Sequence, residues 1–298
     1  MWGNVRVRAL PAPPSFQLRL RSLMELLWKI VSAIILALVE GITEFLPVSS
    51  TGHMILAQEL LNLDVPPGHV FEIFIQFGAI LSICVIYFQY LWRVTKAVPF
   101  SEHARRFAFG LFIAFLPAAA LGVTLSDYIT TYLFSKYVVA TMLVVGGVAI
   151  IFIERMVKIP QYYAVEEFPL SLYLKIGLCQ CLALVPGVSR SGATIMGSLL
   201  MRVERSAAAE FSFFLAIPTM LGASVYSIYK HHTELHASDM LVLAIGFVIA
   251  FISAYYVAKV FISFVSNHGF GVFAWYRIIV GSFMLGYFIL QDIARATA

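Results

Sequence analysis

Long apolar segments separated by short polar loops make up most of the chain. Two apolar regions, 26–63 and 173–201, are interrupted midway by Pro, Ser and Gly. Their arms are too short for each to cross a hydrocarbon core of about 30 Å, so we expect two re-entrant helix pairs. The pattern predicts an all-α polytopic membrane protein with about six transmembrane helices plus these two pairs. The six expected spans are 70–91, 107–126, 137–153, 206–229, 239–262 and 273–290.

The two interrupted regions resemble each other. An offset of 140 residues aligns three positions of one with three of the other: Ser49 with Ser189, Thr51 with Ser191 and Gly52 with Gly192. Each region is followed by three spans, and because three is odd the second half enters the membrane from the opposite side. We therefore expect an inverted-topology repeat, with halves at about 25–153 and 173–290. Such folds place their site where the broken helices meet, near the membrane midplane.

Lysine and arginine in the short loops predict the orientation of the spans. Loops 92–106, 154–172 and 202–205 are rich in these residues, whereas loops 127–136 and 230–238 hold one lysine each. Since basic loops stay in the cytoplasm, the first three should be cytoplasmic. Counting crossings then puts both ends of the membrane body outside.

Composition supports the bilayer as solvent. Hydrophobic residues make up 61% of the chain and charged residues 12%, against about 25% charged in soluble domains. The first 24 residues hold four arginines and no acid, and we expect a disordered basic tail or a segment upstream of the true start at Met24. Residues 25–298 should form a single membrane domain. That body is formally neutral, which argues against nucleic acid as a partner.

The first break carries two carboxylates and a run of hydroxyls, in the sequence Glu40-Gly-Ile-Thr-Glu-Phe-Leu-Pro-Val-Ser-Ser-Thr-Gly-His53. Glu40 and Glu44 lie one helical turn apart on the same face. Paired acids in an apolar setting are costly unless something compensates their charge. A divalent cation, Mg²⁺ or Ca²⁺, would do so because it prefers oxygen ligands. The alternative is a pair of cavity-facing acids satisfied by water.

The second break, 186–194, reads as an anion cradle. Gly187 permits close approach of a ligand, and free amides at a helix start attract anions. The guanidinium of Arg190 is a permanent charge whose fork matches phosphate. Arg190 could instead serve structurally, paired with Glu40 or Glu44. The hydroxyls of this break belong to Ser189, Ser191 and Thr194.

Together the breaks supply the groups that phosphoryl transfer needs. Ser50 is the preferred nucleophile, with Glu44 or His53 as the base that takes its proton. His53 could instead protonate the leaving group. Gln180, which aligns with Glu40, is expected to hydrogen-bond within the site. A carrier or flippase for a lipid phosphate remains the alternative, although a carrier has no need of a nucleophile beside a base.

Both motifs closely resemble those of the undecaprenyl-diphosphate phosphatase family associated with bacitracin resistance, and the resemblance covers about residues 25–292. It implies removal of the terminal phosphate of undecaprenyl diphosphate, which recycles the lipid carrier for peptidoglycan synthesis. It also implies a divalent cation, Mg²⁺ or Ca²⁺, and a site facing the outside of the bacterial cytoplasmic membrane. A homodimer is left open.

The resemblance assigns roles residue by residue. The catalytic residues that it implies are Glu40, Glu44, Ser50, His53 and Arg190, with Glu40 and Glu44 at the metal. Expected phosphate or supporting contacts are Ser49, Thr51, Gly187, Ser189, Arg190, Ser191 and Thr194.

Overall fold

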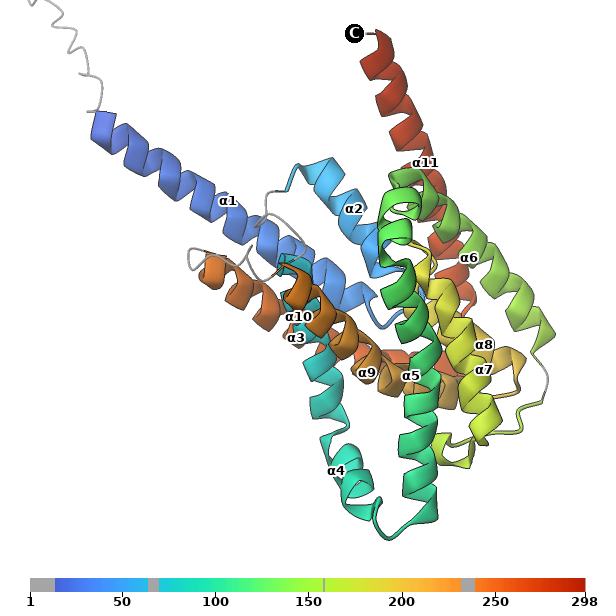
Figure 1. The fold of residues 1–298 in the computed structure, drawn as a ribbon. Coiled ribbons are helices and arrows are strands. Elements are labelled where there is room, and N and C mark those ends of the chain that lie inside the picture. Colours follow the sequence, from blue (N-terminus) through green and yellow to red (C-terminus); the bar gives the residue numbers. More distant parts are fainter. Residues whose placement is uncertain (1–13, 64–69, 158, 232–238, 298) are drawn as a thin grey trace, which may run out of the picture.

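The computed structural model describes residues 14–63, 70–157, 159–231 and 239–297 (Figure 1). Within these ranges the regular structure is helical, apart from an isolated bridge between Tyr162 and Val203. The α-helices are α1 (Pro14–Thr43), α2 (Ser50–Leu61), α3 (Val70–Ile86), α4 (Phe88–Ala97), α5 (Glu102–Tyr128), α6 (Lys136–Met156), α7 (Leu170–Gln180), α8 (Arg190–Leu200), α9 (Arg205–His231), α10 (Met240–His268) and α11 (Gly271–Thr297). Short helices of other types are η1 (Ile129–Leu133), η2 (Val165–Glu167) and η3 (Cys181–Leu184).

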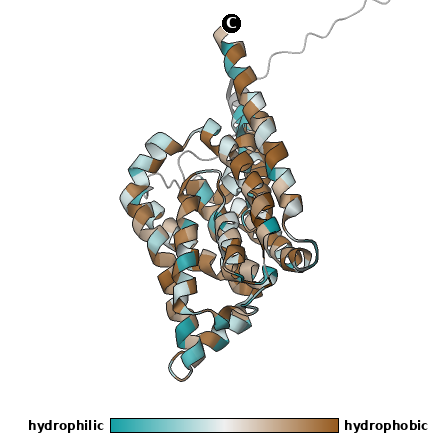
Figure 2. Cartoon of the chain, turned by 90° about the vertical axis from the view of Figure 1, so that its right-hand side faces the viewer, coloured by the Kyte–Doolittle hydropathy of each residue, from teal (hydrophilic) through white to brown (hydrophobic). Residues whose placement is uncertain are grey.

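Six of the described helices are long and apolar enough to cross a membrane, which confirms the all-α polytopic fold. They are Arg21–Thr43, Glu102–Leu133, Lys136–Met156, Arg205–Lys230, Met240–His268 and Gly271–Thr297. Large apolar side chains cover their outer surfaces, as a lipid solvent requires. Figure 2 shows hydrophobic residues through the body of the bundle and hydrophilic ones gathered toward its ends, most clearly at the lower end.

The expected span over 70–91 is interrupted by a bend. The chain breaks at Tyr87, and α3 and α4 meet at a bend of 71°. The reason is local chemistry: α4 combines apolar Phe88 and Trp92 with basic Arg93 and Lys96. Lys96 lies over the Trp92 ring, 4.7 Å from its centroid. Such a pairing of tryptophan with a basic side chain is suited to the membrane interface.

The start of the chain also differs from expectation. Helix α1 begins at Pro14, so residues 14–24 are helical rather than a disordered tail, while residues 1–13 lie outside the described ranges. Proline at the first helical position favours a helix start because its missing N–H has no partner there in any case. As a result α1 is long enough to cross a membrane, not the short arm expected.

The two broken regions nevertheless form hairpins that open toward opposite ends of the molecule. Figure 1 shows α1 descending to the first break and α2 returning toward the upper end, while α7 rises to the second break and α8 returns toward the lower end. The helices after each hairpin repeat in order. Helix α3 packs on α9 and α6 on α11, and the α1–α10 contact mirrors that of α7 with α5.

The backbone at the two breaks carries the same unusual conformation. Ser49 has φ of 71° and Ser189 has φ of 78°. These residues occupy equivalent places, each immediately before the returning helix of its hairpin. Left-handed φ in a residue other than glycine costs about 1–3 kcal/mol and is concentrated at functional sites. The shared strain supports the predicted inverted repeat at the level of single residues.

Candidate functional site

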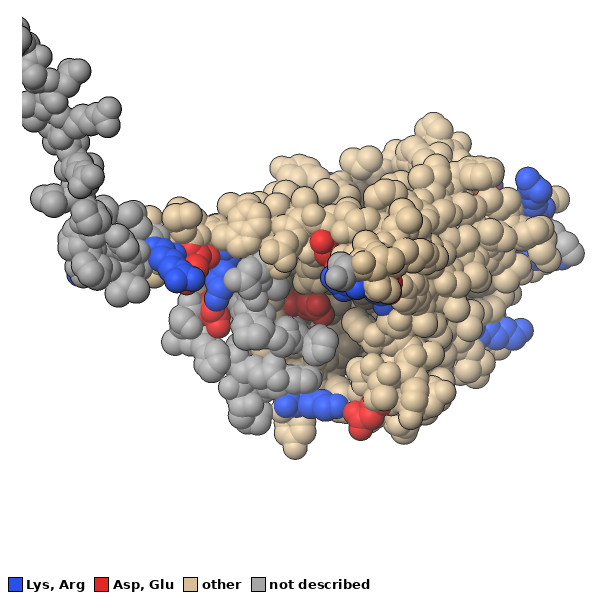
Figure 3. Space-filling view, turned by 90° about the horizontal axis from the view of Figure 1, so that it is seen from above, with Lys and Arg blue, Asp and Glu red and all other residues tan. Residues whose placement is uncertain are grey.

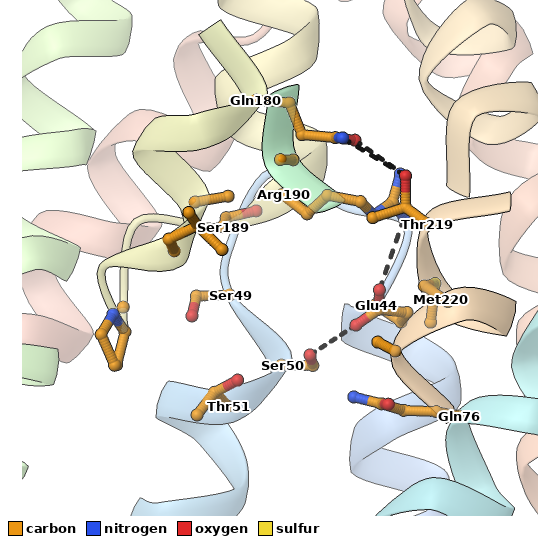
Figure 4. A pocket seen from close by; sticks show the side chains of 16 residues that line it. Glu44, Ser49, Ser50, Thr51, Gln76, Gln180, Ser189, Arg190, Thr219 and Met220 are labelled. Atoms are coloured by element: carbon orange, nitrogen blue, oxygen red, sulfur yellow. Dashed lines mark hydrogen bonds and ion pairs between the residues drawn. The ribbon is translucent and has the colours of Figure 1, made fainter. Parts of the chain in front are cut away.

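The two breaks meet around a cavity of about 260 Å³ in the interior of the bundle. Figure 4 shows Glu44, Ser49, Ser50 and Thr51 approaching it from the first break and Gln180, Ser189 and Arg190 from the second. Gly187 of the second break, with φ of 93°, also lines this cavity. Gln76 of α3 and Thr219 of α9 complete its polar lining. The sequence-based expectation that both motifs build one site agrees with this geometry.

Glu44 is the link between the halves. Its Oε2 accepts a 2.6 Å hydrogen bond from the Ser50 hydroxyl, and its Oε1 lies 3.4 Å from Nη2 of Arg190. Glu44 and Arg190 are both largely buried, with side chains 9% and 11% exposed, so water screens their attraction little. The arrangement holds a hydroxyl, a carboxylate and a guanidinium in one contact chain.

Helix α9 fixes the direction of the arginine. Nη1 of Arg190 donates to the main-chain oxygen of Ser212 at 2.8 Å and lies 3.3 Å from its hydroxyl. The Thr194 hydroxyl donates to the same Ser212 hydroxyl at 2.8 Å, which places Thr194 behind the arginine rather than in the cavity lining. Among the described residues, the buried Nε of Arg190 has no hydrogen-bond partner.

Hydroxyl groups tie the second break to the first. Ser189 caps α8 by accepting from the amide of Gly192 at 3.1 Å, and its Oγ lies 3.0 Å from that of Ser191. The Ser191 hydroxyl is fully buried and donates to the main-chain oxygen of Leu46 at 2.7 Å. Ser189 and Thr51 therefore face the cavity, whereas Ser191 joins the breaks behind it.

His53 does not line the cavity. One ring nitrogen, Nδ1, lies 2.8 Å from the main-chain oxygen of Ser49, and Nε2 lies 2.8 Å from the hydroxyl of Tyr276. The two rings stack with their planes 2° apart. Of the two bases left open by the sequence, only Glu44 contacts Ser50. His53 instead holds the strained backbone of Ser49 through its carbonyl.

Gln180, the counterpart of Glu40, pairs with Thr219 on α9. Its Nε2 lies 3.3 Å from the Thr219 hydroxyl, which donates to the main-chain oxygen of Leu215. Both residues line the cavity. The expectation that Gln180 hydrogen-bonds within the site agrees with this contact. At this corner the second half thus presents neutral groups where the first half has a carboxylate.

Known proteins share this arrangement of motifs over nearly the whole chain. The sequence model of the bacitracin resistance protein BacA family matches residues 33–283. The chain belongs to the BacA family. The resemblance identified from the two motifs is thereby confirmed.

Three relatives of this BacA-family chain are all named undecaprenyl-diphosphatase. An undecaprenyl-diphosphatase of Parvibaculum lavamentivorans is 55% identical over 260 residues, 87% of this chain and 97% of the relative. An undecaprenyl-diphosphatase 2 of Paramagnetospirillum magneticum is 53% identical, over 85% of this chain and 97% of its own length. One from Rhodopseudomonas palustris is 48% identical over 85% of this chain and 95% of the relative.

In this BacA-family site, Glu40 is the carboxylate whose charge is costliest to bury. It is fully buried, and neither carboxylate oxygen has a hydrogen-bond partner among the described residues. Buried charges are normally paired or bound to a metal, so this orphaned carboxylate fits a cation held together with Glu44. No group of three or more His, Cys, Asp or Glu in the described ranges is arranged to hold a metal. A cation bound by two carboxylates would complete its shell with water and phosphate oxygens, as Mg²⁺ commonly does.

Arg277 on α11 is the structural centre that sequence reasoning missed. It is 1% exposed, and its guanidinium donates five hydrogen bonds of 2.9–3.2 Å to main-chain oxygens. The acceptors are Pro47 in the first break, Gly187 and Val188 in the second, and Met142 and Leu143 of α6. The available signal was an arginine inside an otherwise apolar span, which is expensive in a membrane unless it has a task.

Proposed function

We propose that this protein is an undecaprenyl-diphosphate phosphatase, which releases the terminal phosphate and leaves undecaprenyl phosphate. The observation that carries the proposal is the 2.6 Å contact between Ser50 and Glu44 beside Arg190 in one buried cavity. A hydroxyl nucleophile beside a base serves hydrolysis, whereas a carrier has no need of one. The names of the relatives support the same activity rather than a lipid carrier.

The geometry suggests a two-step displacement. The Oγ of Ser50 attacks the terminal phosphorus while its proton passes to Glu44. The bond from this phosphorus to the bridging oxygen breaks, and the lipid monophosphate leaves with the bond's electrons. Arg190 neutralises the charge that spreads over the phosphoryl oxygens. Water then cleaves the phosphoserine, which releases inorganic phosphate and restores the Ser50 hydroxyl.

We further propose that Glu40 and Glu44 hold a divalent cation, Mg²⁺ or Ca²⁺. When bound, the cation would neutralise phosphate charge as a Lewis acid. The burial of the unpartnered Glu40 carboxylate supports this assignment.

The protein is proposed to lie in the bacterial cytoplasmic membrane with its site reached from outside. Figure 1 shows the α4–α5 turn toward the lower end and η1 with the C-terminus at the upper end. The lower end carries the basic loops, including Arg93, Lys96, Arg105 and Arg106, which supports its placement in the cytoplasm. In this position the enzyme would return the carrier lipid to peptidoglycan synthesis.

The test is phosphate release from undecaprenyl diphosphate by the purified protein in detergent. We expect release with Mg²⁺ or Ca²⁺, loss after addition of a chelator, and recovery when the cation is restored. Glu44→Gln, prepared in the same way, is the inactive reference. The proposal is wrong if the folded protein releases no phosphate with either cation present.

A further inference from the structure

A second cavity continues from the site between α5 and α9. It encloses about 610 Å³, within the range of about 300–1,000 Å³ that is typical of ligand pockets. Four residues line both cavities: Ala118, Leu184, Thr219 and Ala223. The two cavities are therefore adjacent, because the same four residues border both.

The lining of this groove changes from one end to the other. Beside the site it is formed by apolar and small residues, namely Phe115, Ala119, Gly122, Val123 and Gly222. Farther along, toward the upper end, the lining includes Ser126 of α5, Thr130 of η1 and Lys230 of α9. There Lys230 pairs with Asp127 at 3.0 Å. Figure 3, viewed from above, shows a hollow near the centre of this face, with acidic and basic side chains close to it and uncharged surface over most of the rest.

The groove exists because the two halves depart from their symmetry. In the repeat, α5 and α9 correspond to α10 and α3, and that equivalent pair is closed by glycines. A Cβ at Gly78 would collide with the main chain of Phe247, and one at Gly246 would lie 2.7 Å from the Phe71 ring. Between α5 and α9 the approach at the glycines is looser. A Cβ at Gly122 would meet only Leu184, at 3.6 Å, and one at Gly222 only the Phe115 ring, at 3.3 Å.

We propose that this groove binds the isoprenoid chain of the substrate next to its diphosphate, an inference that rests on the proposed function. The terminal phosphate belongs at Ser50 and Arg190, so the attached chain must leave the site cavity through a connected apolar space. The groove between α5 and α9 adjoins the site cavity and shares four lining residues with it. A second apolar pocket, which includes Leu46, Val260 and Phe273, shares no lining residue with the site cavity.

Two uncharged residues, Gln180 and Thr219, form a hydrogen-bonded pair at the border between the two cavities. Thr219 lines both spaces, and its partner Gln180 lines the site side. A chain in the groove puts the phosphate that carries it beside this pair. The second N–H of the Gln180 amide is then the donor to the phosphate that stays with the lipid, and Thr219 holds that amide in place. Arg190 binds the phosphate that is released.

The test compares soluble substrates that differ only in chain length, at one detergent concentration. Dimethylallyl diphosphate has one isoprene unit and farnesyl diphosphate has three. Because even a single methylene in an apolar pocket is worth roughly tenfold, we expect kcat/KM of the wild type to be at least about tenfold higher for farnesyl diphosphate. Gly122→Leu fills the groove and should lower this ratio at least about tenfold.

A matched glycine provides the control. A Cβ at Gly286 of α11 would meet nothing within 4 Å, so Gly286→Leu adds the same side chain at an exposed position away from the groove. It should keep the wild-type ratio. Leucine in place of a helical glycine favours the helix in both variants, and their unfolding temperatures will show whether each remains folded.

Three outcomes would overturn the proposal. The wild type could hydrolyse both substrates with a ratio near one, which removes the chain site and leaves the phosphatase intact. Gly122→Leu could reduce both substrates equally, which would indicate a blocked entrance instead. Val260→Trp, in the separate pocket, could lower the ratio while Gly122→Leu does not, which would place the chain there. Failure of the wild type on both substrates and on undecaprenyl diphosphate would instead contradict the proposed function.

Discussion

The hydroxyl of Ser50 donates to Glu44 across the break between α1 and α2. Glu44 directly follows the last residue of α1, and Ser50 is the first residue of α2. The left-handed backbone of Ser49 turns the chain between them, and the His53 ring holds the Ser49 carbonyl. The nucleophile and base of the proposed reaction are therefore neighbours because of the turn, not because of helix periodicity.

Removing the nucleophile should stop turnover without unfolding the protein. We expect Ser50→Ala to lower kcat by at least about a hundredfold, the scale of losing a positioned proton-transfer partner. Ser198→Ala, which removes a buried hydroxyl that only bonds within α8, should retain near wild-type kcat. Initial rates of phosphate release over one series of substrate concentrations give kcat for both variants. Solvent-oxygen labelling that shows direct attack by water on the substrate would exclude Ser50 as the nucleophile.

Glu40 should couple cation binding to stability. In the absence of metal its buried carboxylate is uncompensated, so Glu40→Gln is expected to raise the unfolding temperature of metal-free protein. Mg²⁺ or Ca²⁺ should stabilise the wild type more than the variant, because a cation that binds the folded state shifts unfolding by mass action. Thermal unfolding with and without cation measures this directly. Equal stabilisation of the two proteins would remove Glu40 from the cation site.

Lysine should not replace Arg190. The guanidinium contacts Ser212 and Glu44 with different nitrogens, which a single ammonium cannot reproduce. We expect Arg190→Lys to lower kcat/KM at least about tenfold, the worth of roughly 1.4 kcal/mol of transition-state stabilisation. Arg205→Lys, at a half-exposed ion pair with Glu154, is the control and should stay within about twofold. If Arg190→Lys were as active as Arg205→Lys, a positive charge alone would be sufficient at position 190.

Arg277 should be the most sensitive structural position. Arg277→Met leaves five buried carbonyls without their donor, and each unsatisfied buried group costs about 1–3 kcal/mol. We expect a large fall in the unfolding temperature and in the yield of folded protein. Arg295→Met, near the end of the same helix and exposed, should change neither. A folded Arg277→Met protein with unchanged unfolding temperature would contradict this role.

The strain at Ser49 can be separated from its hydroxyl. Ser49→Gly and Ser49→Ala remove the same hydroxyl, which makes no capping hydrogen bond to α2. Only glycine adopts φ of 71° without steric cost. We expect the glycine variant to be more stable than the alanine variant by about 1 kcal/mol. Unfolding temperatures of the two in one detergent give the comparison, and a more stable alanine variant would show that the backbone there is not strained.

The sequence by itself determined the broad architecture and most of the polar residues around the cavity. Hydropathy reports how each segment partitions between lipid and water, so it located the apolar helices and the two polar breaks. The repeat gave the opposed hairpins, and the motifs named Glu44, Ser50 and Arg190. These features are local or periodic along the chain, which is why residue order alone reveals them.

Only the tertiary structure decided which groups meet and which serve as supports. The partner of Ser50, the rotation of His53 toward Tyr276 and the Leu46 contact of Ser191 depend on how the two halves pack. The same holds for Arg277. Broken helices leave carbonyls without intrahelical donors, and which side chain reaches them is set by a helix more than eighty residues away in sequence. The groove between α5 and α9 likewise arises from packing, because glycines close one helix pair and leave its equivalent open.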